Sequence, residues 1–143
     1  MTRIPTSPFT ELGQVEFLKD SAVVTLTASV LSGHEMAGRL SHFFKGIHSR
    51  GARNFILDLQ NVTAMDSACV SILISLLTDL QAHPDRGGIA LVNASSNVSY
   101  LFKLTRLDRM FPICRDVMAA LAAVENPVRQ PAKPAAPSWW HLG

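Results

Sequence analysis

Two short apolar runs separated by one helix-length segment constrain the fold of this chain more than any other feature. The runs are NFILDL at residues 54–59 and IALVN at 89–93, and each is typical of a buried β-strand. The segment between them, from Ser67 to His83, has an unusually apolar helical pattern and stops at Pro84. A strand, a helix and a second strand in this order predict a parallel pair joined by a crossover helix.

The flanking sequence extends this alternation on both sides. Two apolar runs within residues 15–28, divided at Lys19-Asp20-Ser21, are typical of a β-hairpin. Helical spacing at 35–49, 98–107 and 115–125 predicts further helices, and Ser or Asn side chains at 94–97 can cap the second of them. Residues 110–113 predict an edge strand, because Pro112 cannot donate to a ladder. The predicted fold is α/β, a mixed, largely parallel sheet of four to five strands with about four helices.

The chain is expected to form one domain with two terminal extensions. Residues 1–13 predict a flexible lead, residues 14–126 the domain, and residues 127–143 a Pro-rich disordered tail. A length of 143 residues suits one hydrophobic core and is short for two. The Trp139-Trp140 pair in the tail fits a partner anchor, self-packing or an added terminal sequence, and the pattern leaves all three open.

Charge and hydropathy exclude several classes of function. With Arg129 and Lys133 of the tail set aside, 11 of the 13 basic residues remain against 11 acidic ones. A near-neutral domain lacks the basic stripe of a nucleic-acid surface, so we expect no nucleic-acid partner. No apolar run reaches the roughly 18 residues of a membrane span, and the N-terminus has no secretory apolar region. We therefore expect a cytoplasmic protein without a membrane span.

The sequence holds no pattern typical of a metal or thiol site. His34, His42 and His48 lack the spacing and the acidic or thiol company of a zinc site. Cys69 and Cys114 are far apart, without CxxC spacing, and their apolar neighbours predict buried free thiols. We expect no metal and no cofactor.

Asp66 and Ser67 stand directly before the apolar helical segment. An Asp in this place is a good N-cap, which accounts for Asp66 without any function. Ser67 lacks a Gly-x-Ser-x-Gly elbow, and no His or acid is placed to activate it, so catalysis is not expected. Small polar residues then recur every four positions and form either a plain solvent face or a docking face: Ser67, Ser71, Ser75 and Asp79.

These elements together resemble a known family. NFILDLQNVTAMDSACVSILISLL, GGIALVNASSNVSYLFKLTRLDRMFPI and a final DVMAAL resemble a STAS domain of the anti-sigma factor antagonist family. The resemblance covers residues 15–125, and its most specific parts are ILDLQNVTAMDS and LFKLTRLDRMFPI. It implies a binding module rather than an enzyme.

The resemblance implies a phosphorylation switch at Ser67. In the family, the unphosphorylated protein binds an anti-sigma factor that is also a serine kinase, and so releases a sigma factor. The kinase, using its own ATP and magnesium, phosphorylates the serine and breaks the complex, and a PP2C-type phosphatase resets it. The alternative is a non-catalytic STAS subunit of a larger assembly, such as a lipid-transport ABC ATPase or a stress-sensing complex.

The resemblance also implies a partner surface around Ser67. Its expected members are Ser32, Gly33, His34, Asp66, Ala68, Cys69, Ser71 and Ser75. Two departures from the family fall on this surface. Cys69 stands where many members have Gly, which would hinder the approach of a kinase, and Ser32-Gly33-His34 stands in the loop where the family usually has Gly-x-Leu-Asp.

Overall fold

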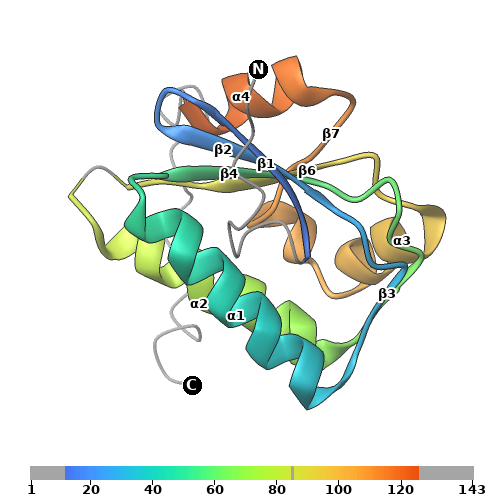
Figure 1. Cartoon of the computed structure of the whole chain (residues 1–143). Helices are drawn as coiled ribbons and strands as arrows, with labels where there is room; N and C mark the ends of the chain where they lie inside the picture. Colours follow the sequence, from blue (N-terminus) through green and yellow to red (C-terminus); the bar gives the residue numbers. More distant parts are fainter. Residues whose placement is uncertain (1–11, 85, 126–143) are drawn as a thin grey trace, which may run out of the picture.

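A five-stranded sheet forms the centre of the computed structural model, which describes residues 12–84 and 86–125 (Figure 1). The strands, in their order across the sheet, are β1 (Gly13–Leu18), β2 (Ser21–Leu26), β4 (Asn54–Asp58), β6 (Ile89–Val92) and β7 (Ile113–Cys114). β1 and β2 are antiparallel, and each later pair is parallel. The predicted mixed, largely parallel sheet is confirmed. The predicted tail and nearly all of the predicted lead lie outside the described residues.

Helices cover both faces of this sheet. α1 (Gly33–Ser49) and α2 (Ser67–Ala82) pack side by side on one face, with α3 (Ser96–Leu104) beyond them, and α4 (Val117–Glu125) lies on the other face (Figure 1). A short 3-10 turn, η2 (Leu107–Arg109), follows α3. The prediction of about four helices is confirmed.

The main core lies between α1, α2 and the sheet. Leu40, Phe43, Phe44 and Ile47 of α1 are buried as their spacing predicts. The ring of Phe44 meets that of Phe55 in an edge-to-face contact with centroids 5.8 Å apart. Every residue of β4 and β6 is buried, because both faces of these central strands are covered.

A smaller core lies under α4. Ile56, Ala90 and Val92 of the central strands pack there against Ala120 and Val124 of the helix.

Two elements differ most from their predicted bounds. The helix expected at 98–107 begins at Ser96, where Ser95 accepts a hydrogen bond from the Val98 N–H (3.2 Å), and it ends at Leu104. Arg106 has a φ of 64°, in the left-handed region, so the helix cannot continue through it. The last strand is Ile113–Cys114, later than the expected 110–113.

A second, two-stranded sheet was not predicted. It pairs β3 (Val30–Leu31) with β5 (Ala64–Met65) in parallel. Each strand has only two residues, which is too short for an alternating pattern to be visible in the sequence.

Asn54 is a buried polar junction at the amino ends of the central strands. Its side-chain amide donates to the hydroxyl of Ser21 (3.3 Å), and its carbonyl oxygen accepts from the Gly88 N–H (3.0 Å). The Ser21 hydroxyl in turn donates to the Glu125 carboxylate at the end of α4 (3.0 Å). This chain of bonds joins β2, β4 and the start of β6 to α4.

Candidate protein-binding site

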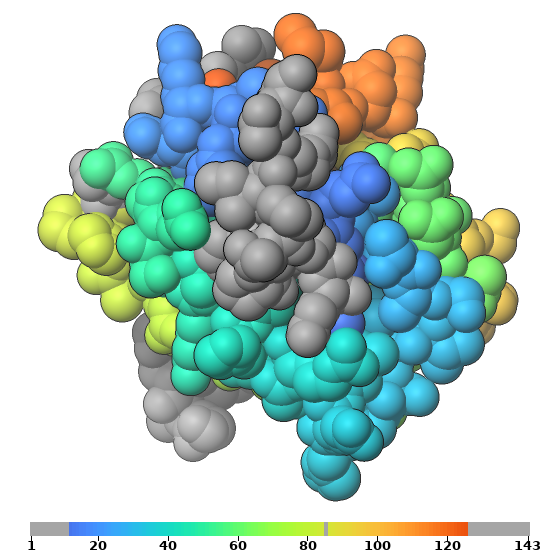
Figure 2. All heavy atoms as spheres, in the orientation of Figure 1, coloured from blue at the N-terminus to red at the C-terminus, as the bar shows by residue number. Residues whose placement is uncertain are grey.

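The small β3–β5 sheet places the starts of α1 and α2 next to each other. Val30 pairs with Ala64 and Leu31 with Met65, and the Asp66 N–H donates to the Leu31 carbonyl (2.9 Å). In the space-filling view the light-blue segment around β3 meets the green residues that precede α2 at the surface (Figure 2). Segments more than thirty residues apart in the sequence thus form one edge of the molecule.

The Asp66 carboxylate connects the two helix starts. Its Oδ1 accepts from the Cys69 N–H (3.0 Å), so the predicted N-cap of α2 is confirmed. Its Oδ2 accepts from the N–H of Gly33, the first residue of α1 (2.9 Å). Ser32 precedes α1 but makes no side-chain capping bond, so Asp66 supplies an acceptor for both helices.

Gly33 suits this arrangement because of its backbone conformation. Its φ is +92°, in the left-handed region that favours glycine over residues with a Cβ. The sequence gives no local signal for the bond between Gly33 and Asp66, since 33 positions separate them.

Asp66 carries a fixed negative charge at this edge. Hydrogen bonds from the backbone N–H groups of Gly33 and then Cys69 lower its pKa below the ordinary value of 3.8, because they favour the ionised carboxylate. The site therefore presents one carboxylate at neutral pH.

Ser67 is the first residue of α2 and is exposed. Ser71, Ser75 and Asp79 are exposed on the same helix, so the four-residue repeat faces outward. The Ser71 hydroxyl donates back to the Ser67 carbonyl (2.9 Å). The side chain thus lies against its own helix, and this face of α2 has only short side chains near Ser67. Contact with a partner along it stays a prediction.

The prediction that Cys69 lies on the partner surface needs correction. Its side chain is 0% exposed and points into the core, so it cannot contact a partner or obstruct a kinase. Burial, and then the negative charge of Asp66, raise the pKa of Cys69 to about 11, so it stays a neutral thiol. Cys114 is only half-buried, and burial followed by the charge of Asp116 raises its pKa too. Both thiols are free, but only Cys69 is fully buried.

The other predicted surface residues cluster around Asp66. Ser32, Gly33 and His34 are exposed at the start of α1, and Ala68 is half-buried beside Ser67. The structure therefore brings the predicted segment at 32–34 next to the predicted segment that begins at Asp66. Of the predicted residues, only Cys69 is fully buried.

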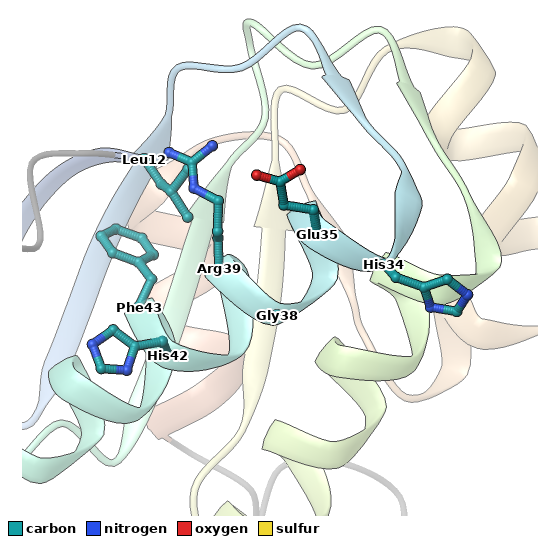
Figure 3. A pocket seen from close by; sticks show the side chains of 7 residues that line it. All are labelled: Leu12, His34, Glu35, Gly38, Arg39, His42 and Phe43. Carbon is teal, nitrogen blue, oxygen red and sulfur yellow. The ribbon is translucent and has the colours of Figure 1, made fainter.

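A shallow hollow of about 450 Å³ lies along the exposed side of α1 (Figure 3). Its lining residues are Leu12, His34, Glu35, Gly38, Arg39, His42 and Phe43. Glu35 and Arg39 extend to the same side of the helix, whereas His34 extends away from them (Figure 3). Two opposite charges at its rim select neither an anion nor a cation.

Two further observations concern residues 12–84 and 86–125. No three His, Cys, Asp or Glu side chains in these ranges come together as a metal site would require. None of the helices in these ranges combines the length and the apolar character needed to cross a membrane.

Comparison with known proteins agrees with this architecture. The structure is similar to an anti-sigma factor antagonist from Mycobacterium paratuberculosis (22% identity, TM-score 0.67, covering 83% of this chain and 97% of that chain). It is similar to the anti-sigma factor antagonist SpoIIAA in its unphosphorylated form (21%, 0.62, 82% and 96%). It is also similar to the Bacillus cell fate determinant SpoIIAA in the phosphorylated form (19%, 0.56, 82% and 99%). At these identities the likeness establishes the fold.

The family comparison covers most of the chain. The model of the STAS domain matches residues 13–120, which span β1 to the middle of α4. Together with the five-stranded sheet and its four helices, this match shows that the chain belongs to the STAS domain family.

Proposed function

We propose that this protein is a phosphorylation-controlled binding switch that acts as an anti-sigma factor antagonist. The observation that carries the proposal is the exposed Ser67 at the start of α2, directly beside the Asp66 carboxylate that connects both helix starts. A hydroxyl in this place is open to a kinase, and it lies at the centre of the predicted partner surface.

The chemistry of a helix start favours a reversible switch. Unpaired N–H groups and the helix dipole tolerate a phosphate there, so the domain can stay folded when the serine is modified. A phosphoserine brings a charge of about −1.5 to −2. Added next to Asp66, it changes the charge and bulk of the surface without requiring a new fold.

The proposed partner is an anti-sigma factor that is also a serine kinase. Unphosphorylated Ser67 permits the complex, and the sigma factor is released. The kinase brings ATP and magnesium, so this chain needs no cofactor of its own and acts as a binding module, not as an enzyme. A PP2C-type phosphatase removes the phosphate, and the cycle takes place in the cytoplasm.

The proposal is tested by incubating the full chain with its cognate anti-sigma factor kinase, ATP and magnesium, followed by intact-mass measurement. We expect the mass to rise by one phosphoryl group in the natural chain and in Ser71→Ala, and not in Ser67→Ala. No gain, or an equal gain in Ser67→Ala, would contradict the assignment of Ser67. Stable co-purification with a transporter ATPase, with no phosphorylation, would instead favour the STAS subunit of a larger assembly.

Ser71 tests whether the α2 face contacts the partner. We expect Ser71→Trp to weaken kinase binding by about tenfold or more, because a large side chain would rise from a surface of small residues. The melting temperature should change little, since Ser71 is exposed and its hydroxyl bonds only to the helix backbone. Calorimetric titration and thermal unfolding measure the two effects.

Thr78→Trp is the matched control for this substitution. Thr78 is also exposed and donates to its own helix, at the Ile74 carbonyl (2.9 Å), but it lies two turns farther from Ser67. We expect a smaller loss there. Equal affinity of Ser71→Trp and the natural chain would show that this face is only solvated.

A further inference from the structure

The corner formed by α3 and η2 combines exposed apolar and basic side chains. Tyr100 and Leu104 are 66% and 65% exposed, and Met110 is 41% exposed. Tyr100 and Leu104 are four residues apart on α3, so they lie on the same side of the helix. We call this surface the α3 corner; it comprises Tyr100, Lys103, Leu104, Arg106, Arg109 and Met110.

Its charges are of one sign. Lys103, Arg106 and Arg109 are exposed, and Asp108, which is half-buried, is the only acidic residue between positions 96 and 115. None of these three cations forms an ion pair within the described part of the chain. The domain as a whole is near neutral, so this local basic excess is a property of the corner.

The inner side of the α3 corner is closely packed and hydrogen-bonded. Phe102 and Phe111 meet edge to face with ring centroids 5.7 Å apart, and both are fully buried. The Met110 and Phe111 N–H groups both donate to the Leu107 carbonyl (2.9 Å each). Exposure of the outer apolar side chains therefore does not come from loose packing of the turn.

The corner also adjoins the candidate protein-binding site. At the start of α3, the Asn97 side-chain amide donates to the Thr63 carbonyl (3.4 Å), one residue before β5. A partner that covers Ser67 therefore needs only to extend past Asn97 to reach Tyr100.

We propose that the α3 corner binds an acidic segment with apolar side chains from the partner protein that docks around Ser67. Carboxylates of such a segment would face Lys103, Arg106 and Arg109, and its apolar side would cover Tyr100 and Leu104. Aromatic, Met and Arg side chains are enriched at protein interfaces. The identity of the partner rests on the proposed function, whereas the chemistry of the segment rests on this corner.

A protein segment fits the corner better than an anionic membrane does. Helices that lie on membranes present a long apolar face and a long basic face. α3 has nine residues, and Asn97 and Thr63, where α3 meets the candidate protein-binding site, are neutral. A compact mixed patch of this kind is suited to one helix or strand of a protein.

The test uses the full chain, labelled with nitrogen-15, and a synthetic acidic peptide of about 16 residues, with Leu every third or fourth position and Glu elsewhere. We expect its amide shift changes to concentrate at residues 98–110. A peptide with Lys in place of each Glu should not bind. Vesicles of phosphatidylserine and phosphatidylcholine are the second probe, and they should not bind either.

Two pairs of substitutions separate the charge from the apolar contribution. We expect each pair to lower the affinity for the acidic peptide by about tenfold or more. The charge pair is Lys103→Glu with Arg106→Glu, and the apolar pair is Tyr100→Ala with Leu104→Ala. Lys19→Glu with Arg86→Glu makes the same charge change at the opposite, amino end of the strands and should have no effect.

The outcomes distinguish this inference from the proposed function. Shift changes away from residues 98–110, equal losses in the control pair, or binding to vesicles but not to peptide would overturn the α3 corner as a protein-docking surface. If the peptide binds at the α3 corner but Ser67 gains no phosphate, the α3 corner stands as a docking surface and the proposed phosphorylation switch is rejected.

Discussion

Phosphorylation of Ser67 is expected to lower affinity for the partner kinase by roughly 100-fold or more, while the domain stays folded. Ser67 is exposed. A phosphate on its hydroxyl would therefore face solvent or the partner and not the protein interior. The adjacent Asp66 is already ionised, because its hydrogen bonds lower its pKa. The added charge therefore concentrates at one edge of the contact surface.

Three variants separate charge from bulk at this position. Ser67→Asp should reproduce most of the loss of affinity. Ser67→Asn has nearly the same shape as Ser67→Asp without the charge, so it should lose less affinity. Ser67→Ala should bind like the natural chain. Titration calorimetry at low and high salt measures this, because the charge contribution is screened by salt whereas bulk is not.

Thr78→Asp is the positional control. It adds the same charge to the same helix about 16 Å farther along, at 1.5 Å per residue over eleven residues. Thr78 is exposed like Ser67, so any general effect of negative charge on α2 should appear in both variants. Equal affinity of Ser67→Asp and Ser67→Asn would show that phosphate charge does not control binding.

Asp66→Ala is expected to loosen the loop before α1 and to lower the melting temperature by several degrees. The substitution removes the acceptor of both the Gly33 and the Cys69 N–H groups, so two helix starts lose their cap at once. Amide hydrogen exchange should become faster at Gly33 and along the β3–β5 pair. Unchanged exchange at Gly33 would show that the loop does not depend on this carboxylate.

Asp66→Asn is the matched control, since an asparagine side chain has an NH2 donor in place of one of the two carboxylate oxygens, so one of the two N–H groups loses its acceptor. It should keep the α2 cap and lose the bond to Gly33. Exchange at Gly33 should then rise while the start of α2 stays protected. The comparison assigns the loop effect to Oδ2 alone.

The contribution of Asp66 to stability should depend on pH in a defined direction. Its folded pKa lies below the ordinary 3.8, so the folded state favours the ionised form. The stability difference between the natural chain and Asp66→Asn is therefore fully present above about pH 4 and is lost as pH falls through the lowered folded pKa. Urea unfolding of both proteins across acidic pH measures it.

The sequence contained most of the information needed for the large elements. The apolar runs at β4 and β6 and the helical spacing of Leu40, Phe43 and Ile47 in α1 are strong periodic signals, and each was confirmed. The caps at Asp66 and Ser95 follow from local chemistry and could also be predicted. These features depend on neighbours within a few residues.

The relation between the two helix starts could not be predicted in the same way. β3 and β5 have two residues each, and the Gly33–Asp66 bond joins distant parts of the chain. The inward direction of Cys69, however, had a signal: Cys69, Leu73, Leu76 and Leu80 recur at spacings of four and three, and all are buried. That spacing places Cys69 on the core side of α2.

The buried Asn54 junction has a consequence for how fast this domain can assemble. Its side chain bonds to Ser21, 33 positions earlier, and to Gly88, 34 positions later. Each parallel pairing beside it therefore needs a long loop to close before its contacts form, which slows folding. A signal that required the sheet to unfold and pair again would be limited by this step, whereas a change of surface charge at Ser67 leaves every long loop closed.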